Sequence, residues 1–381
     1  MEFSLSQEQE MLKQSVRDFA ENVLGPGVAD RDEKEYFDPL SFKGMADLGL
    51  TGIPFEECWG GAGMDFTAYA LAVEEIARID PSAADSLSSH VSLGTVPIWK
   101  HGTEEQKKKF LIPLVSGEKQ AAFALTEANA GSDALGMTTR AELVGDEWVL
   151  NGRKIFITNG EAADTYIVFA RTGDKELGSK AFSAFIVEKG TPGFCFGKFE
   201  RKMGLRGTQN CDLVYEDCHI PKKNLLGQVG QGFKIAMQTL DGGRIGIAAQ
   251  SVGLAQGAME KALDYAKNRV QFGKPIAKQQ VISFKFADMA LAIECARLLT
   301  YKAAWKESNN LPFGLDAAMA KLKASETAMW VTNQAVQIHG GYGYTRDFPV
   351  ERMMRDAKIT ELYEGTSEIQ RMVISNHVIN R

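Results

Sequence analysis

The first third of the chain carries apolar residues at three- and four-residue spacing, which is the periodicity of an amphipathic helix. Ser6 and Gln9 have the spacing of a capping box at the start of this pattern. The glycines of the stretch 60–63 interrupt it before it resumes. Residues 1–120 are therefore expected to form a helical domain. Its amphipathic segments lie at 5–24, 66–79 and 103–115.

Near residue 120 the pattern changes to short runs rich in β-branched and aromatic residues, separated by Gly, Asn, Asp and Pro. Such runs are typical of strands joined by turns. Residues 121–226 are therefore predicted to form an antiparallel sheet or small barrel. The expected strands are AAFALT (121–126), EWVLNGRKIFIT (147–158), TYIVFA (165–170), SAFIVEK (183–189) and CDLVYEDCHI (211–220).

After the glycines at 227, 230 and 232, helical periodicity returns and no proline occurs before Pro275. The stretch 235–272 has room for one or two long helices, and 282–307 and 317–340 supply two more. Residues 227–381 are predicted to form a four-helix bundle. The fold class is thus α+β and mainly α, with helical, β and helical domains in that order.

The composition indicates an ordinary soluble globular protein, with 44% apolar and 24% charged residues in 381 and a net charge of −6. An acidic chain is a poor partner for nucleic acid or an anionic membrane. The five cysteines are odd in number and form no C-x-x-C pair, which favours a reducing compartment. With no leader pattern and no apolar run of spanning length, we expect a cytoplasmic protein without membrane insertion.

Several common catalytic motifs are missing from the sequence. No G-x-G-x-x-G follows a strand, and neither a P-loop, H-E-x-x-H nor G-x-S-x-G is present. The histidines are scattered, so no metal site is expected. These absences make a Rossmann-type nicotinamide enzyme, an NTPase, a metalloenzyme and a serine hydrolase poor candidates.

The stretch ITELYEGTSEIQR (359–371) places Glu364 between a tyrosine and a glycine. Ser367 and Gln370 have capping-box spacing, which predicts a helix beginning near Glu368. Glu364 would then lie on a tight loop at the entrance of that helix. Such a carboxylate is either a turn former or a reactive group held by rigid elements. The stretch alone leaves both interpretations open.

Seven stretches, taken in order, resemble the acyl-CoA dehydrogenase family of flavoproteins, and the helical N-terminal third fits the same pattern. Together they cover essentially the whole chain, and 239–250 with the helices after it is most similar to the short-chain, butyryl-CoA type. The stretches are FALTEANAGSD (123–133), KIFITNG (154–160), KMGLRGT (202–208), TLDGGRIGIAAQ (239–250), NRVQFGKPIAKQQ (268–280), QIHGGYGY (337–344) and RDAKITELYEGTSEIQR (355–371).

The resemblance implies non-covalent FAD, a homotetramer built as a dimer of dimers, and α,β-dehydrogenation of an acyl-CoA to the trans-2-enoyl-CoA. Electrons would leave through an electron-transferring flavoprotein. One alternative is the same fold working as an enoyl-CoA reductase with that partner. Others are a branched, medium-chain or aromatic acyl-CoA dehydrogenase, an acyl-CoA oxidase, and a catalytically silent scaffold that binds flavin or acyl-CoA.

The resemblance also assigns the catalytic base to Glu364, which would take the α-proton while the β-hydrogen leaves as hydride to the flavin. Burial of a carboxylate raises its pKa and so suits it to this task. The thioester oxygen would be held by the backbone N–H of Glu364 and a flavin ribityl hydroxyl. The implied FAD residues are Phe123, Leu125, Thr126, Gly131, Ser132, Phe156, Ile157, Thr158, Arg269, Phe272, Gln279, Gln280, Gln337, Gly340, Gly341, Thr366 and Glu368. Of these, Arg269, Phe272, Gln280 and the 337–341 group would act from a neighbouring subunit.

The implied substrate residues are fewer. Asp241 and Arg244 lie three apart and would share one helical face. They would contact CoA, or would form only a local ion pair. Tyr363 would line the acyl pocket or would be a core aromatic. Gly365 lets the loop approach the ligand closely, and Ser132 approaches phosphate or substrate.

Overall fold

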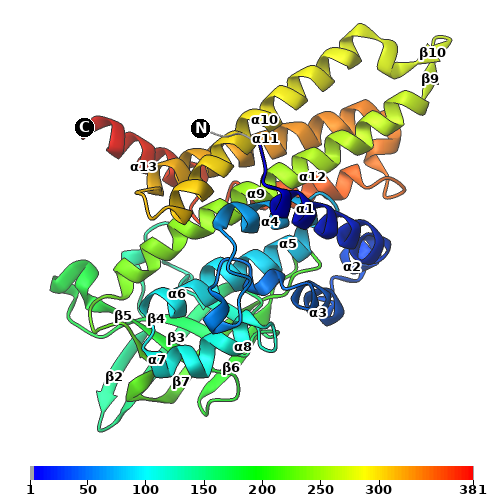
Figure 1. Ribbon diagram of the computed structural model, residues 1–381. Coiled ribbons are helices and arrows are strands. Elements are labelled where there is room, and N and C mark those ends of the chain that lie inside the picture. The colour runs from blue at the N-terminus through cyan, green and yellow to red at the C-terminus, as the bar shows by residue number, and fades with distance from the viewer. Residues whose placement is uncertain (1–3, 381) are drawn as a thin grey trace.

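The computed structural model describes residues 4–380, which form helices, then a sheet, then helices again (Figure 1). This order matches the sequence prediction. The change from helix to strand occurs between Val115 and Ala121, and the change back occurs between Leu226 and Gly232.

The N-terminal helices begin with the predicted capping box. The Gln9 amide donates to Ser6 Oγ at 3.1 Å, and the Ser6 amide donates to Gln9 Oε1 at 3.1 Å. A second capping box, between Thr103 and Gln106, was not predicted. The helices are α1 (Gln7–Phe19), α2 (Val28–Lys34), α3 (Pro39–Asp47), α4 (Phe66–Ala77), α5 (Pro81–Ser88), the π-helical η5 (Ser89–Thr95), α6 (Val96–His101), α7 (Glu104–Gln106), the π-helical η6 (Lys107–Leu111) and α8 (Ile112–Val115).

The middle of the chain forms one sheet of eight strands in the order β6-β7-β3-β2-β4-β5-β8, with β1 paired to β4. Most pairs are antiparallel as predicted, but β1 and β2 each run parallel to β4. Sequence reasoning missed β2, β6 and β8. β2 is largely exposed and lacks the apolar run that marks the other strands, whereas β6 begins with the apolar residues FCF but contains no fully buried residue. The strands are β1 (Ala121–Ala124), β2 (Arg140–Val144), β3 (Glu147–Thr158), β4 (Thr165–Arg171), β5 (Phe182–Glu188), β6 (Phe194–Phe199), β7 (Asn210–Pro221) and β8 (Leu225–Leu226).

Three long helices and one shorter helix make the C-terminal bundle, and α13 packs against α11. The stretch that had room for two helices forms one, α9, which extends from the sheet to the β9–β10 hairpin (Figure 1). The elements are α9 (Gly232–Asn268), β9 (Val270–Gln271), β10 (Lys274–Pro275), α10 (Gln280–Ser308), α11 (Gly314–His339), the 3-10 helix η11 (Gly340–Tyr344), α12 (Val350–Ile359) and α13 (Ser367–Ile379).

Glycines let α9 lie directly against the backbone of α4 and the turn after it. A Cβ at Gly253 would lie 2.0 Å from the Glu74 carbonyl oxygen, and one at Gly257 would lie 2.1 Å from that of Arg78. Glycine is normally unfavourable inside a helix, and here the close approach compensates for that.

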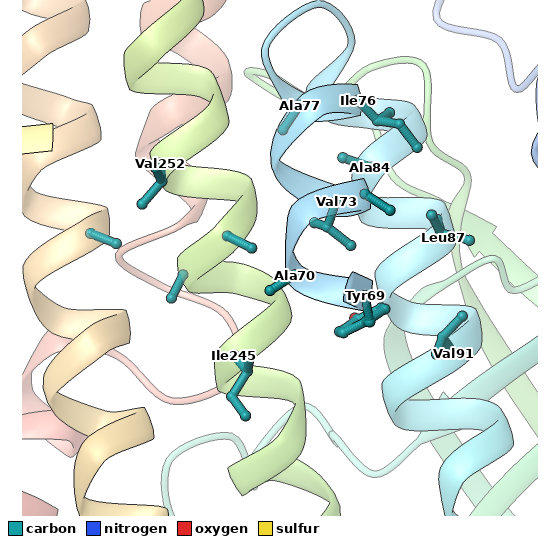
Figure 2. Packing of buried hydrophobic residues seen from close by; sticks show 14 of the residues in the cluster. Tyr69, Ala70, Val73, Ile76, Ala77, Ala84, Leu87, Val91, Ile245 and Val252 are labelled. Atoms are coloured by element: carbon teal, nitrogen blue, oxygen red, sulfur yellow. The ribbon is translucent and has the colours of Figure 1, made fainter. Parts of the chain in front are cut away.

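Two hydrophobic clusters flank the sheet, and the larger one joins the N-terminal helices, one face of the sheet and the bundle. Figure 2 shows part of it. Ala70 of α4 points toward α9, while Tyr69 points toward the helix that carries Leu87 and Val91. The elements α4, α5, η5 and α9 therefore meet around one buried region, to which the loop before α13 also belongs.

No helix within residues 4–380 is both long and apolar enough to cross a membrane. In the same part of the chain, the His, Cys, Asp and Glu side chains form no cluster suited to a metal ion. The five cysteines are free thiols, and two of them, Cys211 and Cys218, are buried in the sheet.

Candidate active site

Glu364 lies on the tight loop between α12 and α13, with its backbone in the left-handed region. Its φ is 51° and that of Gly365 is 91°. A non-glycine residue in this region is uncommon and is found more often at functional sites. The helix after the loop is capped by Thr366, whose side chain accepts from the Ile369 amide, so the predicted Ser367 cap was wrong by one residue. The prediction failed because Thr366 and Ser367 both suit an N-cap.

Two side chains hold the carbonyl groups of this loop. Lys321 Nζ donates to the Gly365 carbonyl at 2.8 Å, and Gln370 Nε2 donates to the carbonyls of Glu364 at 3.2 Å and Gly365 at 2.8 Å. The backbone N–H of Glu364 makes no hydrogen bond to any residue between 4 and 380. The loop therefore presents an unused backbone donor next to the carboxylate.

The Glu364 carboxyl group faces α9, where Gly243 leaves room for it. Its Oε2 is buried and has no hydrogen-bond partner in the described chain. Burial, and then the negative charge of Asp85, raise the pKa of Glu364 to about 8, although Lys321 and Arg244 both act to lower it. A carboxylate with this pKa is suited to proton abstraction near neutral pH.

Gly243→Ala is expected to displace the Glu364 carboxyl group. An added Cβ would lie 2.1 Å from Glu364 Oε2 and 2.7 Å from Leu93 Cδ2. A misplacement of about 1 Å in a reacting group costs on the order of 100-fold in rate, so kcat should fall by roughly that factor. Steady-state kinetics of the flavin-loaded enzyme would measure it.

The neighbouring Gly242 supplies a matched control, because a Cβ there meets nothing within 4 Å. Gly242→Ala should retain full activity and the same or slightly higher stability, as alanine favours helix. Equal activities for the two alanine variants would contradict this placement of the carboxyl group.

Lys321→Met is expected to move the pH dependence of the reaction upward. The lysine is fully buried and its positive charge lowers the pKa of Glu364. Without that charge the pKa of Glu364 rises further above 8, so the rising limb of kcat/KM against pH should shift to higher pH. An unshifted limb would contradict this coupling. Lys323→Met is the control, since Lys323 lies on the same helix and makes no hydrogen bond or ion pair with the described residues.

Of the predicted substrate residues, Tyr363 and Gly365 flank Glu364 in the chain, and Arg244, with its partner Asp241, acts on the Glu364 carboxyl group from α9. Arg244 Nη1 and Asp241 Oδ1 form an ion pair of 2.6 Å, as their spacing suggested. Arg244 is buried and its Nε has no partner in the described structure, so it is more than a solvated surface arginine. The Tyr363 hydroxyl donates to Gln250 Oε1, which places this tyrosine inside the protein beside α9.

The first group of predicted FAD residues lies on β1, the loop after it, and the end of β3. Phe156 is unusual there, since it lies at a β-bulge with φ of 59° and has 59% of its surface exposed. Thr158 Oγ1 accepts from Asn210 Nδ2 at 2.9 Å. The side chain of Ile157 is buried in the sheet, so only its backbone is available to a ligand. Phe123 and Thr126 are half-buried, Leu125 is buried, and Gly131 and Ser132 are exposed.

A buried ion pair that sequence reasoning missed joins this loop to β3. Lys154 is fully buried, and its Nζ donates to Glu127 Oε1 at 2.8 Å and to the Leu125 carbonyl at 2.9 Å. Glu127 also accepts from the amides of Thr138 at 2.7 Å and Thr139 at 3.0 Å. Both residues stand inside quoted motifs, but a lysine in a strand pattern usually indicates an exposed position.

The second group of predicted FAD residues lies at the far end of the bundle, beside the β9–β10 hairpin (Figure 1). The Arg269 guanidinium lies 5.7 Å from the Tyr342 ring centroid, so the structure brings the 269–280 and 337–344 stretches together. Phe272 is 95% exposed with φ of 52°. Gln279 precedes α10 and Gln280 begins it, Gln337 lies near the end of α11, and Gly340 and Gly341 follow in η11. The structure does not bring this group near Glu364. The two remaining predicted FAD residues, Thr366 and the exposed Glu368, follow Glu364 closely in the chain.

The residues present fit a flavin. An exposed aromatic ring held at a bulge offers a flat apolar surface for a planar ligand. The unused N–H and buried carboxylate of Glu364 are the groups needed at a reacting carbonyl. The exposed Arg269 offers a forked donor suited to a pyrophosphate.

Comparison with known proteins assigns this arrangement to a family. Three family models match the chain: the acyl-CoA dehydrogenase N-terminal domain over 6–118, the middle domain over 122–218, and the C-terminal domain over 230–379. The chain belongs to the acyl-CoA dehydrogenase family. Members of this family are FAD-dependent oxidoreductases.

Two curated members of the family match nearly the full chain. A short-chain-specific acyl-CoA dehydrogenase of Clostridium acetobutylicum is 53% identical and covers 99% of this chain and 100% of its own length. An acryloyl-CoA reductase (NADH) of Anaerotignum propionicum is 50% identical and covers 100% and 97%.

Two solved structures of the family agree with this fold over the whole chain. Butyryl-CoA dehydrogenase from Megasphaera elsdenii has a TM-score of 0.98 at 53% identity, and both chains are covered completely. A structure described with the electron-transferring flavoprotein of Acidaminococcus fermentans has a TM-score of 0.99 at 51% identity, again with complete coverage.

Proposed function

We propose that this family member catalyses the FAD-dependent α,β-dehydrogenation of a short-chain acyl-CoA to the trans-2-enoyl-CoA. The observation that carries the proposal is Glu364, a carboxylate with a raised pKa beside an unused backbone N–H. The names of the short-chain relatives support the substrate class.

In the proposed mechanism, Glu364 removes the α-proton of the thioester. The Glu364 N–H donates to the thioester oxygen and stabilises the negative charge that develops there. Bound FAD would supply the acceptor for the β-hydrogen and its electron pair. The positive charges of Lys321 and Arg244 lower the pKa of Glu364, so that a fraction of its carboxyl groups is ionised at neutral pH.

The flavin is proposed to lie against Phe156 and Thr158, with the loop of Thr126, Gly131 and Ser132 beside it. The group beside the β9–β10 hairpin lies at the other end of α9 from the sheet (Figure 1). We therefore propose that Arg269 and its neighbours reach the FAD of another subunit, within a dimer of dimers. We also propose three domains (1–120, 121–226 and 227–381), an electron-transferring flavoprotein as partner, and a cytoplasmic location.

A second candidate is the reverse reaction, reduction of a short enoyl-CoA. The 50% identity to an acryloyl-CoA reductase favours it, as does the structural match described with an electron-transferring flavoprotein. Both candidates use the same base, because a group that removes an α-proton in one direction returns it in the other.

The proposed function is tested by anaerobic bleaching of the flavin with butyryl-CoA and, separately, by reoxidation of dithionite-reduced enzyme with crotonyl-CoA. Bleaching by butyryl-CoA that Glu364→Gln abolishes would support the assignment. Isobutyryl-, isovaleryl- and longer thioesters, run in parallel, measure the chain-length preference. An FAD-loaded enzyme that no thioester bleaches would overturn the proposal.

A further inference from the structure

The helix α9 and the α5–η5 segment, which both lie beside Glu364, also carry polar groups that the proposed reaction does not use. On α9, Gly243, Gly246 and Gln250 share one face. Gly243 lies against the Glu364 carboxyl group, and a Cβ at Gly246 would lie 2.2 Å from Ser88 Oγ and 2.6 Å from the Tyr69 hydroxyl. Gln250 Nε2 donates to the Pro81 carbonyl at 2.8 Å. The α5–η5 segment therefore follows α9 away from the base.

The face of α5–η5 along this path is polar. Asp85, Ser88 and Ser92 are spaced three and four residues apart, which puts them on one side of a helix, and all three are buried. The Tyr69 hydroxyl donates to Ser88 Oγ at 3.0 Å, and Ser92 Oγ donates to the Ser88 carbonyl at 2.7 Å (Figure 2 shows Tyr69 in this position). A site for a purely hydrocarbon chain has no need of these groups.

Asp85 differs from Ser88 and Ser92 because one of its side-chain oxygens has no hydrogen-bond partner in the described part of the chain. It is 2% exposed, and its Oδ1 has no hydrogen-bond partner among residues 4–380. The cation whose field acts on it, Lys202, donates its own hydrogen bonds to Thr208 and Asn210. The Tyr363 hydroxyl lies against Asp85 and lowers the pKa of its carboxyl group, but it donates to Gln250 Oε1, and Asp85 Oδ1 is left without a donor in the described chain.

A buried carboxylate oxygen without a donor is unfavourable unless a ligand supplies the donor. Asp85 is close enough to Glu364 to act on it electrostatically, and Tyr363 touches Asp85 from the residue next to the base. An acyl chain that begins at Glu364 and follows α9 would bring its distal end toward this oxygen.

We propose that Asp85 accepts a hydrogen bond from a hydroxyl or ammonium group at the distal end of the acyl chain. The substrate class would then be a short acyl thioester with a polar, donor-bearing terminus. This inference rests on the proposed dehydrogenation at Glu364 and deepens it. Ser88, Ser92 and Tyr69 supply further polar contacts along the chain.

The test compares thioesters of equal length on the FAD-loaded enzyme: 5-hydroxypentanoyl-CoA and 5-aminopentanoyl-CoA against hexanoyl-CoA, and 4-hydroxybutyryl-CoA against pentanoyl-CoA. A site built to hydrogen-bond a substrate rejects the analogue that lacks the group. We expect kcat/KM to favour at least one donor-bearing thioester by about tenfold or more. Asp85→Leu should remove that preference, read as the ratio of kcat/KM for the two thioesters of each pair, because loss of the Asp85 charge also lowers the pKa of Glu364 and affects both thioesters alike.

Two further measurements show whether Asp85 prefers a hydroxyl or an ammonium donor, and whether the preference arises in binding or in turnover. Asp85→Asn keeps an acceptor oxygen but loses the charge, so it should retain more of a hydroxyl preference than of an ammonium preference. Calorimetric binding of the inert thioethers S-(5-hydroxypentyl)-CoA, S-(5-aminopentyl)-CoA and S-hexyl-CoA should show the same order, and the same loss in Asp85→Leu, without any reaction.

The outcomes distinguish this inference from the proposed function. Bleaching by butyryl- and hexanoyl-CoA with no donor preference, and no change in the ratios on Asp85→Leu, would overturn the role of Asp85 and leave the dehydrogenase intact. Failure of every thioester to bleach the flavin would overturn both. If Asp85→Leu does not fold, the wild-type thioether binding order decides alone.

Discussion

Replacing Glu364 by glutamine will reduce turnover by about 10⁴-fold, because the amide cannot accept the α-proton and general-base catalysis contributes up to roughly this factor. FAD binding should not change, since glutamine has the same shape and the backbone of the loop is held by Lys321 and Gln370. The measurement is single-turnover bleaching, with flavin content read from absorbance. More than about a tenth of wild-type activity would assign the base to another residue.

The same variant has a second readout that does not depend on substrate. The pKa of Glu364 is raised in the folded protein to about 8 from 4.5. A carboxyl group whose pKa is raised on folding contributes stability that is fully present below the unfolded pKa of 4.5. This contribution is lost as the pH rises from there through about 8. Glutamine titrates nowhere, so the variant should gain Tm relative to wild type between pH 6 and pH 9. A difference in Tm that does not change with pH would mean that Glu364 is not protonated in the folded state.

Replacing Lys154 by methionine will destabilise the protein by about 3–5 kcal/mol and release FAD. The change leaves Glu127 buried without its cation, and breaking one side of a buried pair has a cost of this size. Because Glu127 fixes the amides of Thr138 and Thr139, and Lys154 fixes the Leu125 carbonyl, the loop proposed to hold the flavin should loosen as well. Thermal unfolding and FAD retention on gel filtration measure the two effects.

The matched control is Lys198→Met, which removes a lysine on β6 whose side chain is 66% exposed and paired with Glu200. An exposed ion pair contributes about 0–1 kcal/mol, so this variant should keep its flavin and nearly all of its stability. If Lys154→Met behaves like Lys198→Met, the buried pair does not organise the flavin loop.

The sequence was sufficient for the order of helices and strands because that order depends on local periodicity. Long apolar helices and buried strands are recognisable from the sequence pattern, whereas β2 and β6 carry too few buried side chains to be recognised. Glu364 was found through a motif and its loop through turn residues. Its surroundings were not predictable, because Lys321 and Asp85 reach it from helices far away in the chain, and nothing in their own neighbourhoods marks them as buried.

The same limit explains the error at the start of α13 and the missed ion pair. Thr366 and Ser367 are equally good caps by residue type, and the turn at Gly365 decides between them. Lys154 looks like any polar residue on a strand. Only the fold brings Glu127 opposite it and buries both.

The contact of α9 with α4, made through Gly253 and Gly257, has a consequence for how the protein is made. The ribosome completes α4 and α5 long before α9 emerges, with the whole sheet synthesised in between. At typical rates of about 5–20 residues per second, the apolar surface that α9 later covers stays exposed for on the order of ten seconds. We therefore expect nascent chains that end before α9 to depend on chaperones, and truncations that remove α9 to aggregate rather than fold.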